Sequence, residues 1–190
     1  MNYLIVYAHP NPESFNHAIL ERCEAALKDA DHTCEVRDLY ALKFNPALGR
    51  KELDLLLEKK APKEIIEEQQ HITDADVVVF IYPIWWFAMP AILKGYIDRV
   101  FSEGFAFAIE GDRLTGLLGG KKAIIINTTG APREAFVKTG YEDAMEKMVD
   151  IGIFEFCEMK VIAHKYLYAV PDADEAARKQ MLDEVAGLVT

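Results

Sequence analysis

Three short segments of this chain are dominated by apolar residues, and each is bounded by residues that form turns. They are Tyr3–Ala8 (YLIVYA), Asp76–Tyr82 (DVVVFIY) and Lys121–Asn127 (KKAIIIN). Because β-branched and aromatic residues are frequent in them and polar alternation is absent, they are predicted to be strands covered on both faces. Strands of this kind occur in parallel sheets that lie between two layers of helices.

Segments with helical spacing of apolar residues separate these strands. Ser14 is a good N-cap for the first helix, and Pro62 should split the charged, leucine-rich stretch that precedes the second central strand into short helices. The pattern predicts helices over about 15–29, between Pro90 and Gly104, and over 141–149 and 173–189, with further strands over 33–38 and near 159–164.

This alternation predicts one α/β domain over residues 1–190, with a doubly wound parallel sheet of five strands and helices on both faces. Five strands suit the flavodoxin-like order 2-1-3-4-5, in which a ligand binds at the carboxyl ends of the strands near the switch point. The chemistry is therefore expected in three loops, residues 9–17, 83–90 and 127–134.

Composition excludes several classes of function. The formal charge is −10 with a pI near 5.0, which argues against binding to nucleic acid or an anionic membrane surface. No apolar stretch reaches membrane-spanning length, so we expect a cytoplasmic protein without direct membrane insertion. The three cysteines form no C-x-x-C pair and the five histidines show no ligand spacing, so no metal site is predicted.

The first loop, HPNPESFN, joins a central strand to a helix whose first N–H groups lack partners, and such a helix start favours a phosphate. His9, Ser14 and Asn16 can add donors. The loop contains no glycine, so the dinucleotide and P-loop fingerprints are both absent. The alternative is a capped helix after a proline turn, with no ligand.

The second loop places Trp85, Trp86 and Phe87 in succession after a strand end. Three consecutive rings cannot all enter one core, so at least one should be exposed or line a pocket. Rigid aromatic rings at the mouth of an α/β sheet suit a flat conjugated ligand. Packing on the next helix, or a subunit interface, is the alternative.

The third loop, NTTGAPR, follows a strand with small hydroxyl residues and then Gly130, which lets a backbone approach a ligand closely. Its N–H groups could serve an oxyanion. Arg133 could compensate negative charge on a reduced cofactor, although an exposed arginine without such a role is the more common case.

Together these loops carry a resemblance. The succession HPNPESFN, YPIWWFAMPAILKGYIDRVF and NTTG resembles the flavodoxin-like NAD(P)H:quinone oxidoreductases, a group that includes DT-diaphorase, modulators of drug activity and the ancillary quinone reductases of potassium-efflux systems. The similarity runs in order over roughly residues 1–165, and P-x-x-W-F-x-x-P-A-x-L-K-G is its most specific part. The resemblance implies a flavin held by His9, Ser14, Phe15, Asn16, Pro83, Ile84, Trp85, Trp86, Phe87, Thr128, Thr129 and Gly130.

The resemblance also implies NAD(P)H as co-substrate, a quinone-like acceptor, ping-pong hydride transfer and a homodimer. It slightly favours FAD over FMN. Trp86, Phe136 and Glu142 are candidates for the substrate pocket, where the last two stand at positions that carry Tyr and His in mammalian members. No side chain is assigned as an obligatory catalytic acid or base, since the cofactor supplies the chemistry.

Two other functions remain open from the sequence. A redox-sensing regulatory flavoprotein that docks on a membrane transporter, such as a potassium-efflux system, would share the same fold and loops. A phospho-acceptor receiver domain would share the strand order, but the first strand ends in Ala8-His9-Pro10, where a receiver needs an acidic pair.

Overall fold

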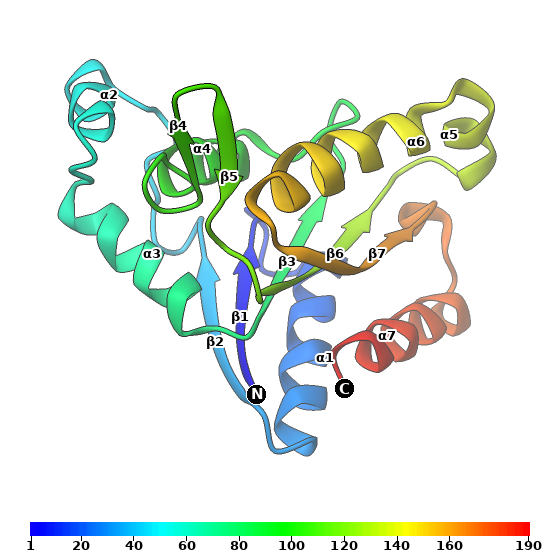
Figure 1. Cartoon of the computed structure of the whole chain (residues 1–190). Coiled ribbons are helices and arrows are strands. Elements are labelled where there is room, and N and C mark those ends of the chain that lie inside the picture. Colours follow the sequence, from blue (N-terminus) through cyan, green and yellow to red (C-terminus); the bar gives the residue numbers. More distant parts are fainter.

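The computed structural model describes residues 1–190 and centres on five parallel strands in the order β2-β1-β3-β6-β7 (Figure 1). Without the separate hairpin β4–β5, this is the predicted order 2-1-3-4-5. The five strands are β1 Asn2–Tyr7, β2 Thr33–Asp38, β3 Val77–Pro83, β6 Lys122–Thr128 and β7 Lys160–Leu167. The three strands predicted to be central lie side by side in the sheet.

Helices cover both faces of the sheet because the central strands are apolar on both sides. In β1, Leu4 and Val6 pack into one core while Ile5 and Tyr7 pack into the other. All seven residues of β3 are buried. The core that contains Ile5 is closed by α1 and α7, which lie against one another (Figure 1). The opposite core is closed by α3, α4 and the π-helix η1.

The helices follow the predicted pattern closely, and Pro62 does separate two helices in the charged stretch. The bounds are α1 Phe15–Asp29, α2 Arg50–Leu57, α3 Lys63–Asp74, α4 Ala91–Val100, α5 Arg133–Thr139, α6 Tyr141–Glu146, η1 Lys147–Phe154, η2 Glu155–Cys157, η3 Val170–Asp172 and α7 Glu175–Val189. No helix is both long and apolar enough to span a membrane.

Three parts of the chain differ from the sequence prediction. The antiparallel hairpin of β4 (Phe107–Glu110) and β5 (Arg113–Gly116) is absent from it, because its strands are only four residues long and largely exposed. The short helix α5 was also missed. The helix predicted over 141–149 is α-helical only to Glu146 and continues as a π-helix to Phe154, a rare geometry without a sequence signature.

Gly95 lets α4 approach the segment before α2. An added Cβ would lie 2.2 Å from the Pro46 carbonyl oxygen. We expect Gly95→Ala to destabilise the protein by about 1–3 kcal/mol, because the clash with backbone outweighs the better helix propensity of alanine.

Gly187 in α7 provides the matched control for this prediction, since nothing lies within 4 Å of its added Cβ. There alanine should raise the free energy of unfolding by about 0.5–1 kcal/mol. Urea unfolding of both variants measures the difference. A Gly95→Ala protein as stable as the wild type would contradict the close packing.

Candidate functional site

The three loops singled out in the sequence meet at the carboxyl edge of the sheet. The Asn16 side-chain amide donates to the Thr128 hydroxyl at 2.8 Å, which joins the first loop to the third. The Ile84 N–H donates to the Thr128 carbonyl at 2.8 Å, which joins the second loop to the third. The His9 and Trp85 rings lie 5.9 Å apart. All three loops therefore form one surface, as the fold prediction requires.

The first loop presents unpaired donors at the start of α1. Ser14 is the N-cap, and its hydroxyl accepts from the His17 N–H. The N–H groups of Phe15 and Asn16 find no acceptor within the chain. These are the groups that bind anions at helix N-termini. The Phe15 ring itself packs toward α7, under the Arg178 guanidinium, so this residue offers the site only its backbone.

His9 can add one more donor to this loop. Its Nδ1 lies 3.1 Å from the Asn11 backbone nitrogen and 3.2 Å from the Asn11 carbonyl oxygen, so in the neutral ring either nitrogen can carry the hydrogen. Burial lowers the pKa of His9, which favours the neutral ring. The loop can therefore meet an anion with neutral donors.

The second loop is a tight turn whose aromatic rings face outward. Trp85 and Ala88 exchange backbone hydrogen bonds of 2.9 and 3.1 Å. Between them, Trp86 and Phe87 have φ values of 51° and 60°, a left-handed conformation that is uncommon for bulky residues. Their N–H groups have no acceptor in the chain, and the Trp86 side chain is 96% exposed. The prediction of an exposed ring is confirmed.

The third loop is buried at its start and has free space around Gly130. Thr128 and Thr129 are buried, and the Thr129 N–H donates to the Leu167 carbonyl. Nothing lies within 4 Å of a Cβ built on Gly130, and its own N–H lacks an acceptor. Asn16 Oδ1 is buried beside this loop without a partner. A ligand with both donors and acceptors would satisfy these groups.

Known proteins share this arrangement. The family model described as a flavodoxin-like fold matches residues 1–188. An NAD(P)H oxidoreductase of Haemophilus influenzae is 35% identical, with 98% of this chain and 93% of that protein covered. Human ribosyldihydronicotinamide dehydrogenase (quinone) is also 35% identical, over 94% of this chain and 86% of its own length. The chain belongs to the flavodoxin-like family of NAD(P)H:quinone oxidoreductases.

Solved structures agree with this assignment. An NAD(P)H:quinone oxidoreductase from Methanothermobacter marburgensis superimposes with a TM-score of 0.88 at 29% identity, over 100% of this chain and 97% of that one. An FMN-dependent NADH-azoreductase from Bacillus anthracis, solved in complex with FMN, shares the fold with a TM-score of 0.74 at 19% identity. This family member is thus an oxidoreductase.

The two residues that depart from the mammalian pattern take different positions. Phe136 is buried behind the second loop, with its ring 5.8 Å from Phe87 and 5.7 Å from Tyr168. Phe87 also stacks on Tyr141 with 4.0 Å between ring centroids. Phe136 therefore supports an exposed ring of the second loop rather than lying at the surface itself.

Glu142 lies in a charged cluster beside these rings. Its carboxylate receives two hydrogen bonds from Arg133, of 2.8 and 3.3 Å, and one from the Tyr168 hydroxyl. The Arg133 guanidinium and then the Tyr168 hydroxyl lower the pKa of Glu142. The negative charge of Glu142 is thus compensated locally. No sequence pattern indicated this pairing, because Arg133 and Glu142 lie on two short helices and Tyr168 follows the end of β7.

The Arg133–Glu142 contact yields a pH prediction. Because the pKa of Glu142 is lowered in the folded state, the contact stabilises the fold above the unfolded glutamate pKa and loses this effect as pH falls through the folded value. Arg133→Gln should therefore raise the pKa of Glu142, measured by carboxyl ¹³C NMR titration.

A second ion pair gives the control. The Lys165 ammonium lowers the pKa of Glu184, so Lys165→Gln should raise the Glu184 pKa and leave that of Glu142 unchanged. An unchanged Glu142 pKa in Arg133→Gln would show that the contact is absent in solution.

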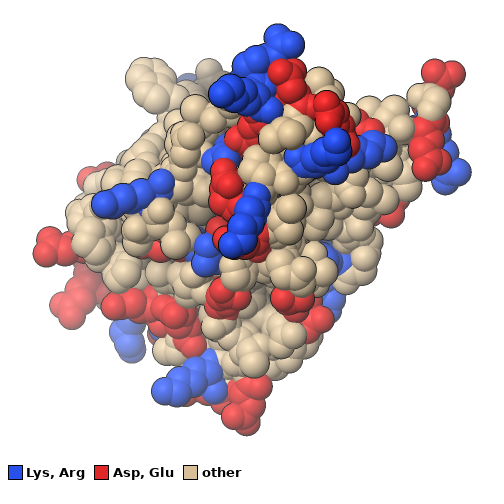
Figure 2. Space-filling model, turned by 90° about the vertical axis from the view of Figure 1, so that its left-hand side faces the viewer, with Lys and Arg blue, Asp and Glu red and all other residues tan.

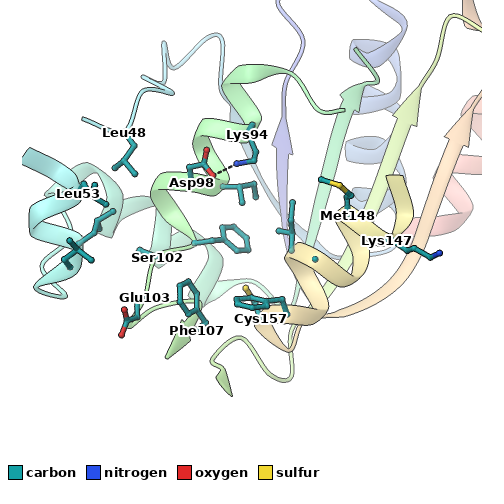
Figure 3. A pocket seen from close by; sticks show the side chains of 17 residues that line it. Leu48, Leu53, Lys94, Asp98, Ser102, Glu103, Phe107, Lys147, Met148 and Cys157 are labelled. Carbon is teal, nitrogen blue, oxygen red and sulfur yellow. Dashed lines mark hydrogen bonds and ion pairs between the residues drawn. The ribbon is translucent and has the colours of Figure 1, made fainter. Parts of the chain in front are cut away.

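A cavity lies elsewhere, in a groove of about 760 Å³ between α2, α4 and η1 (Figure 3). We call it the apolar groove. Apolar side chains form most of its wall, including Leu53, Phe107 and Met148. Figure 2 shows a face on which acidic and basic side chains are interspersed rather than gathered by sign. None of the predicted site residues lines the groove.

Proposed function

We propose that residues 1–190 form one flavin-binding domain that reduces quinones or similar electrophilic acceptors with NAD(P)H. The observation that carries this proposal is the convergence of three loops whose N–H groups lack partners at the carboxyl edge of the sheet. The names of the relatives support the choice of substrates. When bound, the flavin would accept a hydride from NAD(P)H and pass it to the acceptor in a ping-pong sequence.

The first loop would hold the phosphate part of the cofactor. The N–H groups of Phe15 and Asn16 point out of the start of α1, with the Ser14 hydroxyl and the His9 ring beside them. All of these donors are neutral, apart from the partial positive charge of the helix terminus. A chain with a formal charge of −10 can hold an anion at this point because short-range hydrogen bonds decide the local affinity.

The second and third loops would hold the flat ring. The turn at the end of β3 would contact one edge of the ring. Its first residues are Pro83, Ile84 and Trp85, and the free N–H groups belong to Trp86 and Phe87. Thr128, Thr129 and Gly130 would border the opposite edge, where the orphaned Asn16 Oδ1 supplies an acceptor. Fixed backbone dipoles of this kind orient a cofactor without reorganising during the reaction.

The acceptor and NAD(P)H would occupy the same place in turn, beside Trp86 and the cluster of Phe136 and Glu142. The exposed Trp86 ring gives a flat surface for a conjugated acceptor. Phe136 fixes the Phe87 ring, and Arg133 neutralises Glu142 so that its charge does not oppose an electron-rich centre. No protein side chain is required as an acid or base in the hydride step.

Reconstitution with flavin tests this function. We expect the protein mixed with excess FAD or FMN and then desalted to be yellow, and heat release followed by chromatography to identify FAD. Initial rates with NADH or NADPH and a soluble quinone should give parallel double-reciprocal lines, the pattern of ping-pong kinetics. Lack of a flavin absorbance band after reconstitution with either flavin would refute the proposal.

We further propose that the apolar groove is the contact between two copies of this chain. Leu57 and Met148 both line the groove and are 69% and 72% exposed, and exposed apolar side chains gathered in one groove are typical of an interaction surface. The groove also carries both signs of charge, Lys94 and Lys147 against Asp98 and Glu103. A twofold axis brings each patch against its own copy, so a surface with both signs can pair with itself.

Oligomeric state in solution tests this interface. Light scattering after gel filtration should give twice the 21.5 kDa of one chain for the wild type and the mass of one chain for Met148→Glu. Ile66→Glu is the control, because Ile66 is 52% exposed on α3 outside the groove. A monomeric wild type, or a dimeric Met148→Glu protein, would contradict the interface.

A further inference from the structure

A row of polar side chains lies behind the candidate site, on the sheet face that η1 covers. Tyr82, Asn127 and Tyr166 are register partners across β3, β6 and β7, and all three are buried. They are among the last residues of their strands before the loops begin. Two residues earlier, Phe80 and Ile125 stand on the same face of β3 and β6 and belong to the apolar core. The change to polar residues at the strand ends therefore requires an explanation.

His164 connects this row to η1. Its side chain is 5% exposed, and its Nδ1 lies 2.7 Å from Asp150 Oδ1 on the π-helix. Its Nε2 lies 2.7 Å from Asn127 Oδ1. The Asn127 Nδ2 in turn donates to the Tyr82 carbonyl at 3.4 Å. One continuous line of hydrogen bonds thus runs from η1 through β7 and β6 to the end of β3.

The partners fix where the protons lie along this line. A carbonyl oxygen can only accept, so the Asn127 amide must direct its NH₂ group to Tyr82 and its oxygen to His164. His164 Nε2 must therefore carry a hydrogen. Its Nδ1 faces a carboxylate oxygen, and a second hydrogen there makes a charge-assisted bond that satisfies both groups. The ring also stacks on Tyr166 with 4.4 Å between centroids, a contact that favours a cationic imidazole.

We propose that His164, protonated on both ring nitrogens and held by Asp150, is a positioning residue that locks the ends of β3 and β6 together through Asn127. The Tyr82 carbonyl directly precedes Pro83, where the second loop begins, and Asn127 directly precedes Thr128 of the third loop. A fixed spacing here sets the spacing of the free N–H groups of Trp86 and Gly130. That this spacing serves a flavin rests on the proposed function.

The protonation state is tested on the protein without flavin. Long-range ¹H–¹⁵N correlation at neutral pH should show two protonated ring nitrogens for His164. In Asp150→Asn, one of the two should change to the unprotonated type, because the carboxylate that holds the second proton is gone. A single protonated nitrogen in the wild-type His164 ring would overturn the assignment.

The positioning role is tested with His164→Leu and two matched controls. His71→Leu removes another histidine paired with a carboxylate, Glu35, near the opposite edge of the sheet. Ile125→Val loosens the same core without touching the hydrogen-bond line. We expect FMN and FAD to bind His164→Leu about tenfold more weakly, the effect of one lost supporting interaction, and both controls to bind within about twofold of the wild type.

A loss of affinity in Ile125→Val equal to that in His164→Leu would overturn the positioning role, because it would show a general effect of stability. The backbone amide resonances of Trp86 and Gly130 in the apo protein give a second measure. They should shift in His164→Leu and in the milder Asp150→Asn but not in Ile125→Val, and unshifted resonances would overturn the proposal. If the wild type binds neither flavin, the proposed function fails, and these resonances still decide the role of His164.

Discussion

Two hydrogen bonds converge on Thr128, and the site depends on them. The Asn16 side chain donates to its hydroxyl across a separation of 112 residues, and the Ile84 N–H donates to its carbonyl. Both bonds form only because β1, β3 and β6 are neighbours whose carboxyl ends meet at one edge. The strand order of the sheet therefore positions three loops that are far apart in the sequence. A ligand that spans them gains contacts that no single loop offers.

The electrostatics of the site follow from this placement. The chain is acidic overall, yet the groups that face the site are uncharged N–H donors, hydroxyls and a neutral histidine. The carboxylate of Glu142, beside the second loop, is bound by Arg133 and Tyr168. Behind the strand ends, the Asp150 carboxylate lies 2.7 Å from His164 Nδ1. The carboxylates of Glu142 and Asp150 thus have partners within the chain, whereas several backbone N–H groups of the three loops have none.

Strong local patterns made much of the fold predictable. The apolar segments at residues 3–8, 76–82 and 121–127 could only be buried strands, and Ser14 and Pro90 mark helix starts that the structure confirms. The hairpin β4–β5 gave no such signal, because strands of four partly exposed residues have little pattern. The π-helix was missed because this geometry is rare and the apolar spacing of residues 147–154 resembles that of an ordinary helix.

The site was predictable where it consists of strand ends and helix starts, and hidden where it depends on pairs of side chains. The three loops could be identified because parallel strands place their carboxyl ends together. The Arg133–Glu142 and Asp150–His164 contacts could not, because each requires the relative position of two elements. The only available signal for the second pair was the polar Asn127, which directly follows the apolar residues 123–126 of its strand.

The central claim is that the three loops, and not the apolar groove, receive the cofactor. A titration of ¹⁵N-labelled protein with FMN, followed by backbone amide resonances, tests it most directly. The account predicts the largest changes at Phe15, Asn16, Trp86, Phe87 and Gly130, whose N–H groups have no acceptor within the chain. Changes centred on Leu53, Phe107 and Met148 of the groove, with those five amides unmoved, would contradict it.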